Sequence, residues 1–365
     1  DLRVADEAAG LPPMTTRAAY ELLRRLDLAG TWLNALPVYG LPPNWPPYLI
    51  AALDEGGAEL NGFELFDIDY TLYAGDPPAA VVVLRGRFEA AAIDRALTAR
   101  EFTATTDADG ITVWCGPDGC ESGLMINVRD RNPANLFGGH LGRREPMALA
   151  GDTVLNSPDI TALRGLIAAY RGQVPTLADD LAYRAVADHA LRAGRLRQAL
   201  FIDARTFFLD DPAQLILGSA GTSEQIAILR ERLGLDGDFA PVGRAAELMA
   251  VTDHVDTGTG REIASLILVY ADPAAAQAAR DELARRLAEV EIMMLSTRAP
   301  LLEVLESRGL SLSEPALVTD EATGRTLLAL ALQGELLRDE GSLRSGWAVR
   351  MWVDMIYRRD LVWLY

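Results

Sequence analysis

The sequence predicts an α+β protein made of two related mixed α/β domains with antiparallel or mixed sheets, and the likeness of the domains suggests an internal duplication. Three observations lead to this prediction. The chain has 365 residues, of which 50% are hydrophobic, and one hydrophobic core rarely serves so long a chain. Residues 80–115 carry the patterns of a strand, a helix and two further strands. Residues 265–290 repeat the apolar strand, short joint and alanine-rich helix of residues 80–99.

Residues 1–60 are expected to form a helical, proline-rich segment that packs on the first domain. Thr16 can cap a helix that runs through Leu28, because its hydroxyl can accept a hydrogen bond from an amide of the first turn. Prolines make residues 36–47 irregular, and Pro47 fits the first turn of a short helix.

The first domain is predicted to span residues 61–195. A strand at 80–85 precedes a helix at 89–99, in which Ile93 and Leu97 are spaced to face a core. Strands at 102–106 and 111–115 follow, joined by a turn that contains Asp-Gly.

The rest of the first domain reads as one strand and two helices. Residues 147–155 favour the strand, and Ser157 is expected to be the N-cap of a helix that ends at Gly172. Thr176 and Asp179 are arranged like a capping box, which predicts a second helix through about Ala193.

The second domain is predicted to span residues 196–365. Residues 200–205 favour a strand, 223–233 a helix, and 246–255 with 262–270 a hairpin, while Asp272 is expected to cap a helix through Val290. Five apolar residues alternate near the C-terminus and predict a final strand within 347–365: Trp347, Val349, Met351, Val353 and Met355.

The two cysteines, Cys115 and Cys120, flank Gly-Pro-Asp-Gly, which is a strong turn signal. A turn brings their side chains close enough to bond, so we expect a structural disulfide. Disulfides persist outside a reducing cytosol, and the pair therefore favours an exported protein. Trp-Cys-Gly-Pro is similar to the thioredoxin motif, but four residues separate the cysteines here, and a hairpin lacks the helix N-terminus that activates the thiolate.

The composition excludes several classes of function. All 34 basic residues are arginine, so Schiff-base enzymes, biotin carriers and phosphate-loop nucleotide hydrolases, which need a lysine amine, are excluded. Nucleic acid and anionic lipid surfaces would repel a chain with a net charge of −18. The apolar stretches are far shorter than the ~20 residues that cross a bilayer, so we expect no membrane span.

Three aspartates are weak candidates for carboxylate or metal chemistry. Asp67 and Asp69 lie two positions apart, so both could point to one face of a strand as metal ligands. Asp256 begins Asp-Thr-Gly, the tripeptide of aspartic proteases, but the chain has no second such loop to supply the other carboxylate. Solvated carboxylates and a hairpin turn explain these residues more simply.

The three histidines, His140, His189 and His254, come from segments far apart in the chain. None has a metal-ligand partner three or four residues away, so we expect a structural role for each. We therefore predict no metal and no cofactor, although the histidines could converge in space.

Four aromatic residues gather in and beside the proline-rich segment: Trp32, Tyr39, Trp45 and Tyr48. Their flat rings could form a recognition surface for a peptide or glycan, because rings supply contact area at little entropic cost. They could equally pack as a collar over the first domain, which is the interpretation that we favour.

Several short motifs look familiar when taken together. They are Asp69 with residues 74–78 (Ala-Gly-Asp-Pro-Pro), residues 84–88 (Leu-Arg-Gly-Arg-Phe), 110–114 and 170–172, Leu177 and Tyr183. Through them, residues 45–190 resemble the extracytoplasmic part of bacterial secreted or lipid-anchored proteins of unknown function. The resemblance implies an extracytoplasmic location, and it carries no catalytic residues.

These observations predict an acidic, exported cell-envelope protein, secreted or lipid-anchored, that acts as a non-catalytic binding or scaffolding module. Its partner would be a protein or a small ligand of the envelope. The start at Asp1 is what we expect after removal of a signal peptide or lipoprotein leader, or after trimming to the folded part. Two alternatives stay open: a hydrolase that uses carboxylates or a metal at the domain junction, and a carrier of a small ligand or haem.

Overall fold

The computed structural model is an α+β structure in two units, which confirms the predicted fold class. It describes residues 17–25, 41, 45–208, 222–233, 242–256, 259, 261–288, 290–294, 297–335, 337–339, 342–344, 347–358 and 360–364. The described residues up to Thr176 form one unit, here the N-terminal unit, and those from Leu177 onward form the C-terminal unit. The observed boundary, between Thr176 and Leu177, therefore precedes the helix at Leu181–Ala193, whereas the predicted boundary near residue 195 follows it.

The N-terminal unit is built around an antiparallel six-stranded sheet in the order β1-β2-β6-β5-β4-β3. The strands are β1 (Ile68–Ala74), β2 (Val81–Gly86), β3 (Thr103–Thr106), β4 (Thr112–Cys115), β5 (Met147–Ala150) and β6 (Thr153–Asn156). Its helices and short 3-10 turns are α2 (Arg17–Arg25), η2 (Pro46–Tyr48), α4 (Leu49–Asp54), α5 (Gly57–Asn61), η3 (Leu65–Asp67), α6 (Ala90–Ala99), η4 (Cys120–Ser122), η5 (Val128–Asp130), η6 (Gly139–Leu141) and α7 (Ile160–Tyr170).

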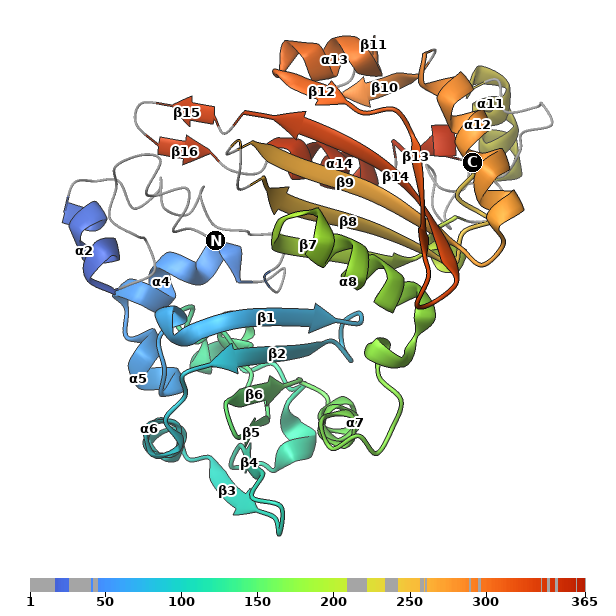
Figure 1. The fold of residues 1–365 in the computed structure, drawn as a ribbon. Coiled ribbons are helices and arrows are strands. Elements are labelled where there is room, and N and C mark those ends of the chain that lie inside the picture. The colour runs from blue at the N-terminus through green and yellow to red at the C-terminus, as the bar shows by residue number, and fades with distance from the viewer. Residues whose placement is uncertain are drawn as a thin grey trace. The chain divides into compact units, whose positions relative to one another are not determined.

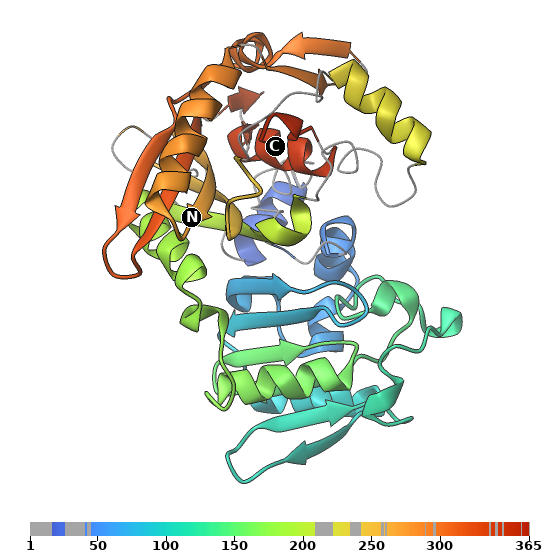
Figure 2. The same ribbon diagram turned by 90° about the vertical axis from the view of Figure 1, so that its right-hand side faces the viewer.

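Helices α6 and α7 cover opposite faces of this sheet (Figure 1). Figure 2 shows α7 in front of the strands after a turn of 90°. On the α7 side, Leu163 and Ile167 pack with Leu155 of β6 in a buried cluster. On the α6 side, Ile93 is fully buried and Trp114 donates its indole N–H to Asp94 at 3.0 Å. The predicted spacing of apolar residues in residues 89–99 therefore matches the buried face of α6.

Two sequence predictions for this unit need correction. Residues 147–155 do not form one strand but the hairpin β5–β6, because Gly151 adopts a φ of 61° and reverses the chain. The N-cap of α7 is Asp159, whose carboxylate accepts the Thr161 N–H at 2.8 Å. Ser157 instead donates its hydroxyl to the Ala80 carbonyl at 2.9 Å and so joins β2 to the start of the helix.

The C-terminal unit has a second antiparallel sheet, in the order β12-β14-β9-β8-β7, with β13 also paired to β14. Its strands are β7 (Arg195–Asp203), β8 (Leu248–Val255), β9 (Glu262–Tyr270), β12 (Leu310–Leu312), β13 (Ala316–Asp320) and β14 (Arg325–Gly334). Two separate hairpins are β10 (Glu291–Met294) with β11 (Thr297–Pro300), and β15 (Leu337–Asp339) with β16 (Ser342–Arg344).

The helices of the C-terminal unit are η7 (Leu177–Asp179), α8 (Leu181–Ala193), α9 (Ala204–Phe207), α11 (Ser223–Leu233), α12 (Pro273–Leu287), α13 (Leu301–Ser307), α14 (Trp347–Tyr357) and η9 (Val362–Leu364). The N-cap of α8 is Asp180 rather than Thr176, since the Asp180 carboxylate accepts two amides of the first turn. Asp272 caps α12, as the sequence predicts.

Helices α8 and α14 pack on opposite faces of the second sheet. Val186 of α8 joins a buried cluster with Ala250 and Ile267. Trp352 of α14 donates its indole N–H to the Ala264 carbonyl at 2.9 Å, and Ala264 points to the other face because it lies an odd number of residues from Ile267.

The predicted C-terminal strand is wrong, because residues 347–357 form helix α14. The alternation of apolar residues from Trp347 to Met355 suggested a strand. However, Ala348 and Trp352, which lie between the alternating positions, are also fully buried. Arg350 and Asp354, four positions apart and within 3.7 Å of each other, mark the polar face of α14, so the helical period was present but the alternation of apolar residues concealed it.

The two sheets share a core order of elements. Each has a hairpin, a helix, a second hairpin and a second helix: β1–β2, α6, β5–β6 and α7, and likewise β8–β9, α12, β13–β14 and α14. In each sheet the second strands of the two hairpins pair in antiparallel fashion, β2 with β6 and β9 with β14. The internal duplication itself stays a prediction.

We expect Trp352→Ala to lower the free energy of unfolding of the C-terminal unit by about 3–5 kcal/mol, since it leaves a cavity under α14. Urea denaturation followed by circular dichroism would measure the change. Tyr357→Ala, on the same helix but 73% exposed, is the control and should cost less than about 0.5 kcal/mol. Equal effects of the two substitutions would contradict the packing of α14.

Candidate functional site

Cys115 and Cys120 form a disulfide, as the sequence predicts. Their Cα atoms are 4.6 Å apart, within the usual range for a bonded pair. The Gly119 N–H donates to the Gly116 carbonyl at 2.9 Å, which closes the predicted turn. The bond joins the end of β4 to the start of η4 and so fixes the beginning of the long segment that leads to β5.

The structure places two of the four aromatic residues, while Trp32 and Tyr39 lie outside the described residues. Trp45 is 1% exposed and meets the Phe137 ring edge-on at 5.8 Å, so it belongs to the core. Tyr48 is half-buried and stacks on His140, with ring centroids 5.3 Å apart. Burial, together with the positive charges of Arg143 and Arg131, holds the pKa of His140 below its usual value.

The three candidate aspartates have separate local environments. Asp67 lies in η3, where its carboxylate accepts the Glu64 N–H at 2.9 Å. Asp69 is exposed at a register shift between β1 and β2. Asp256 lies in the β8–β9 turn, where its carboxylate accepts the Thr259 hydroxyl at 2.6 Å. Among the described residues, no group of three or more acidic, histidine or cysteine side chains could hold a metal ion.

His189 and His254 come close together, which the sequence did not predict. His254 of β8 is 1% exposed, and within the described part of the chain neither of its ring nitrogens has a hydrogen-bond partner. Burial lowers the pKa of His254 to about 4, and repulsion from His189 on α8 adds to the shift. Burial lowers the pKa of His189 as well. Both rings are therefore neutral at pH 7.

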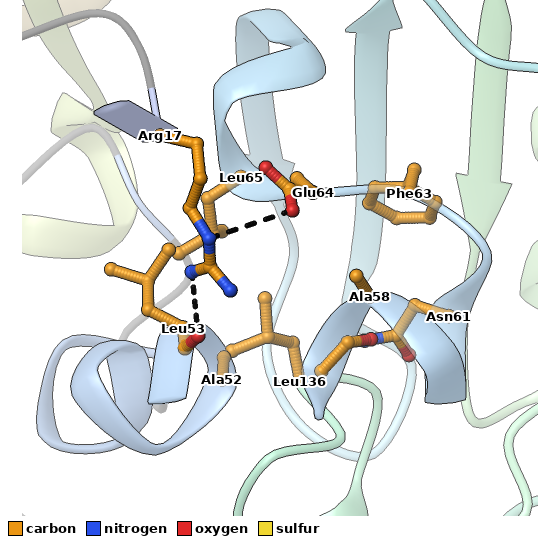
Figure 3. A pocket seen from close by; sticks show the side chains of 10 residues that line it. Arg17, Ala52, Leu53, Ala58, Asn61, Phe63, Glu64, Leu65 and Leu136 are labelled. Carbon is orange, nitrogen blue, oxygen red and sulfur yellow. Dashed lines mark hydrogen bonds and ion pairs between the residues drawn. The ribbon is translucent and has the colours of Figure 1, made fainter. Parts of the chain in front are cut away.

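One hollow of the N-terminal unit is too small for a ligand (Figure 3). It has a volume of about 10 Å³, which is roughly the room that one water needs. Arg17 lies across it, donates to the Leu53 carbonyl at 2.6 Å and reaches within 3.7 Å of the Glu64 carboxylate. These contacts join α2 to α4 and η3, so we assign the hollow to packing.

A larger hollow in the N-terminal unit has a volume of about 280 Å³. We call it the arginine pocket, because three arginines line it. The lining side chains come from the ends of α5 and α6, from η5 and from the segment before β5: Leu60, Ala99, Arg100, Glu101, Asp130, Asn132, Asn135, Arg143 and Arg144.

Each of the three guanidinium nitrogens of Arg144 donates a hydrogen bond to a carboxylate. Arg144 donates through Nε and Nη2 to the Asp130 carboxylate at 3.2 and 3.1 Å. Its Nη1 donates to the Glu101 carboxylate at 3.1 Å. Arg144 thus ties the end of α6 to η5.

Glu101 holds an unusual backbone conformation beside this ion pair. Its φ is 66°, and among the described residues other than glycine it is the one with a positive φ. The position ends α6, where glycine is the favoured residue because a Cβ costs energy there. A carboxylate at this place accepts the hydrogen bond from Arg144, which a glycine could not do.

Arg100 and Arg143 are less completely bound than Arg144. Arg100 donates through Nη1 to the Leu60 carbonyl at 2.9 Å and lies over the Phe102 ring at 5.1 Å. Burial lowers the pKa of Arg100 to about 10, and repulsion from Arg144 contributes. Arg143 Nη1 is 3.9 Å from the Glu145 carboxylate, and its buried Nε has no hydrogen-bond partner in the described part of the chain.

Glu145 lies behind Arg143 with a side chain that is 9% exposed. Burial raises its pKa to about 7, although Arg143 and a hydrogen bond with Asn156 act in the opposite direction. The charge of Glu145 therefore changes near neutral pH, directly beside a pocket arginine.

An exposed apolar loop follows the disulfide and runs into the first residue of η5. Its residues Met125, Ile126 and Val128 are 65%, 57% and 64% exposed. The base of the loop is held at both ends: a Cβ at Gly123 would collide with the Pro158 carbonyl, and one at Gly142 would collide with the Asn127 carbonyl. We call residues 124–128 the apolar loop. Adjacent apolar side chains that a fixed backbone presents to solvent are typical of an interaction site.

Sequence reasoning missed both the arginine pocket and the apolar loop. The pocket residues come from four segments, around residues 60, 100, 130 and 143, and only the fold brings these together. A usable signal was Gly-Arg-Arg at 142–144, an arginine pair after a glycine in an acidic chain. The signal for the loop was Leu-Met-Ile at 124–126, an apolar run between turn residues.

Comparison with family models, curated proteins and solved structures finds no match to this chain. The site must therefore be interpreted from its own chemistry.

The burial of His254 predicts a loss of stability in acid. Its folded-state pKa is about 4, below the ordinary value of 6.5, so stability is full above pH 6.5 and is lost as the pH falls toward 4. His254→Leu should remove about 2 kcal/mol of the stability difference between pH 7 and pH 5. Urea denaturation at the two pH values would measure this, and an unchanged difference in the variant would contradict the assignment.

Proposed function

We propose that the chain is an exported, non-catalytic binding module of the bacterial cell envelope that docks a protein partner through the apolar loop. The observation that carries the proposal is the exposure of Met125, Ile126 and Val128 on a backbone held beside a disulfide. An exposed apolar patch is unfavourable in water unless a partner covers it.

The residues that follow the loop indicate the chemistry of the partner. Arg129 and Arg131 are exposed. In a chain with a net charge of −18, two exposed arginines beside apolar side chains favour a partner with an apolar patch and an acidic rim. Among the described residues, no helix has the length and apolar character needed to span a membrane.

The disulfide supports the proposed location. The bond closes a small loop, because the two cysteines are only 5 positions apart in the sequence. It links the end of β4 to the start of η4, in the same unit as the apolar loop. Such bonds persist in oxidising compartments, which is the basis for placing the protein outside the cytoplasm. The comparisons add no support to the resemblance of residues 45–190 to extracytoplasmic bacterial proteins, so the proposed location rests on the disulfide.

The alternative of a hydrolase at the domain junction has less support. Its candidate carboxylates are used locally: Asp67 accepts an amide hydrogen bond, and Asp256 accepts a hydroxyl within its own turn. The haem alternative needs a histidine beside a cavity, and neither of the two hollows described above is lined by one.

The proposed location predicts the state of the thiols. Protein isolated from its own host and unfolded without reductant should contain no free thiol, whereas the reduced protein should contain one for each of Cys115 and Cys120. Titration with a thiol reagent would measure both. Free thiols before reduction would remove the main internal argument for export.

Docking through the apolar loop predicts a site-specific contact in the host. A photo-crosslinking amino acid at position 126 should give an adduct of discrete mass with a protein, and Met125→Asp should abolish it, since a buried charge is costly at an apolar contact. Mass spectrometry of the adduct would identify its second component. The control is the same amino acid at position 191, where Leu191 is 70% exposed in the other unit.

The same adduct from position 191 would contradict docking through the apolar loop. An adduct of position 126 with lipid alone, or with a second copy of this chain alone, would also overturn the proposal.

A further inference from the structure

We propose that the arginine pocket binds a compact oxyanion, a carboxylate or a phosphate or sulfate group, through Arg100 and Arg143. This site is separate from the apolar loop and does not rest on the proposed docking of a protein partner.

The first argument is the balance of charge in the pocket. Three guanidinium groups line it, from Arg100, Arg143 and Arg144, against the carboxylates of Glu101 and Asp130. The lining side chains thus carry an excess of one positive charge, in a chain where 52 acidic residues outnumber 34 basic ones. Glu145 beside Arg143 offsets this excess only in part, because burial raises the pKa of its carboxyl to about 7. Repulsion between Arg100 and Arg144 is large enough to contribute to the lowered pKa of Arg100. An anion between the guanidinium groups would relieve this repulsion.

The second argument is the set of hydrogen-bond donors that the protein leaves open. Arg144 donates hydrogen bonds from Nε, Nη1 and Nη2 to the carboxylates of Asp130 and Glu101. Among the described residues, Arg100 donates a hydrogen bond through Nη1 alone, and Arg143 Nη1 lies 3.9 Å from the Glu145 carboxylate, too far for a hydrogen bond. If the cluster served only to hold α6 against η5, Arg144 would suffice. The open donors belong to the two arginines that this contact does not need.

The third argument concerns the size and polarity of the pocket. A volume of about 280 Å³ lies just below the usual range of small-molecule sites, so the ligand must be compact. Asn132 adds an amide whose oxygen already accepts the Ala134 N–H at 3.0 Å, so its NH₂ group is the part available to a ligand. Guanidinium and amide donors match the oxygens of carboxylate, phosphate and sulfate.

The conformation of Glu101 supports a functional pocket. Its positive φ of 66° is a costly backbone conformation at the end of α6, and in that conformation its carboxylate accepts a hydrogen bond from Arg144. That ion pair holds Arg144 at the wall, which leaves Arg100 and Arg143 as the groups that meet a ligand.

Titration of the whole protein with sulfate, inorganic phosphate and citrate, at constant ionic strength with chloride as the reference, tests the proposal. Two-dimensional NMR of the arginine side chains gives the readout. We expect saturable binding of at least one probe, with the largest shifts at the Arg100 and Arg143 Nε–H groups. Preference for citrate would point to a carboxylate ligand, and preference for phosphate or sulfate to a phosphorylated or sulfated one. No saturation by any probe, or shifts spread evenly over exposed arginines, would overturn the proposal.

Variants distinguish binding of the anion in the pocket from its general attraction to exposed arginines. Arg100→Gln and Arg143→Gln should each weaken binding by about tenfold or more, the effect of losing a charge-assisted hydrogen bond. Arg95→Gln is the matched control, because Arg95 lies on the same helix as the pocket wall but is exposed, and it should change the affinity less than about twofold. Equal losses in all three variants would overturn the proposal. If Arg100→Gln does not fold, Arg143→Gln and the NMR shifts of the native chain still decide.

The pH dependence gives a second readout, with sulfate because its charge is constant between pH 6.5 and 8. The groups that face Glu145 are Arg143 and Asn156, and His140 lies near Arg143. Protonation of Glu145 below about pH 7 removes the counter-charge from Arg143, so sulfate should bind more tightly at pH 6.5 than at pH 8. Glu145→Gln should abolish most of this difference. A purely structural cluster would show no sulfate binding at either pH.

Discussion

Both units depend on one constraint: the second strand of one hairpin pairs with the second strand of the next. These pairs are β2 with β6 and β9 with β14. In the C-terminal unit, β9 and β14 pair over nine positions, from Glu262 with Gly334 to Tyr270 with Thr326. Both strands are central and their side chains are buried on both faces. A shift by one residue would exchange the residues under α8 with those under α14, and the register is therefore strongly determined. The helices and the remaining strands are arranged around this pairing.

The N-terminal unit adds a long segment to the same plan, and polar contacts hold that segment in place. Between β4 and β5 the chain runs through residues 116–146 with three short 3-10 turns and no strand. The disulfide fixes its beginning, and Arg144 fixes its end through Asp130 and Glu101. A long segment with little secondary structure inside a compact unit is commonly functional. Here it carries both the apolar loop and most of the arginine pocket.

The sequence predicted the local elements of this fold well, and its failures have physical causes. The helix at 89–99, the cap at Asp272 and the disulfide depend on nearby residues, and all three are confirmed. The strand predicted at 347–357 was wrong because the alternation of apolar residues concealed the helical spacing of Arg350 and Asp354. The arginine pocket could not be predicted, because its members are brought together by the fold. His189 and His254 meet for the same reason, although 65 positions separate them in the sequence.

The absence of lysine, which excludes several classes of enzyme, bears on the pocket as well. Burial and repulsion lower the pKa of Arg100 from 12.5 to about 10, and at neutral pH the guanidinium stays charged. The ordinary pKa of a lysine amine is about 10.4, so an equal shift would lower it to about 8. Part of the lysine population would then be neutral at pH 7. A delocalised, weakly hydrated guanidinium also loses less on burial than a compact ammonium ion. Buried positive charge is therefore sustained by arginine where lysine would tend to lose its proton, and an all-arginine chain is suited to a pocket of this kind.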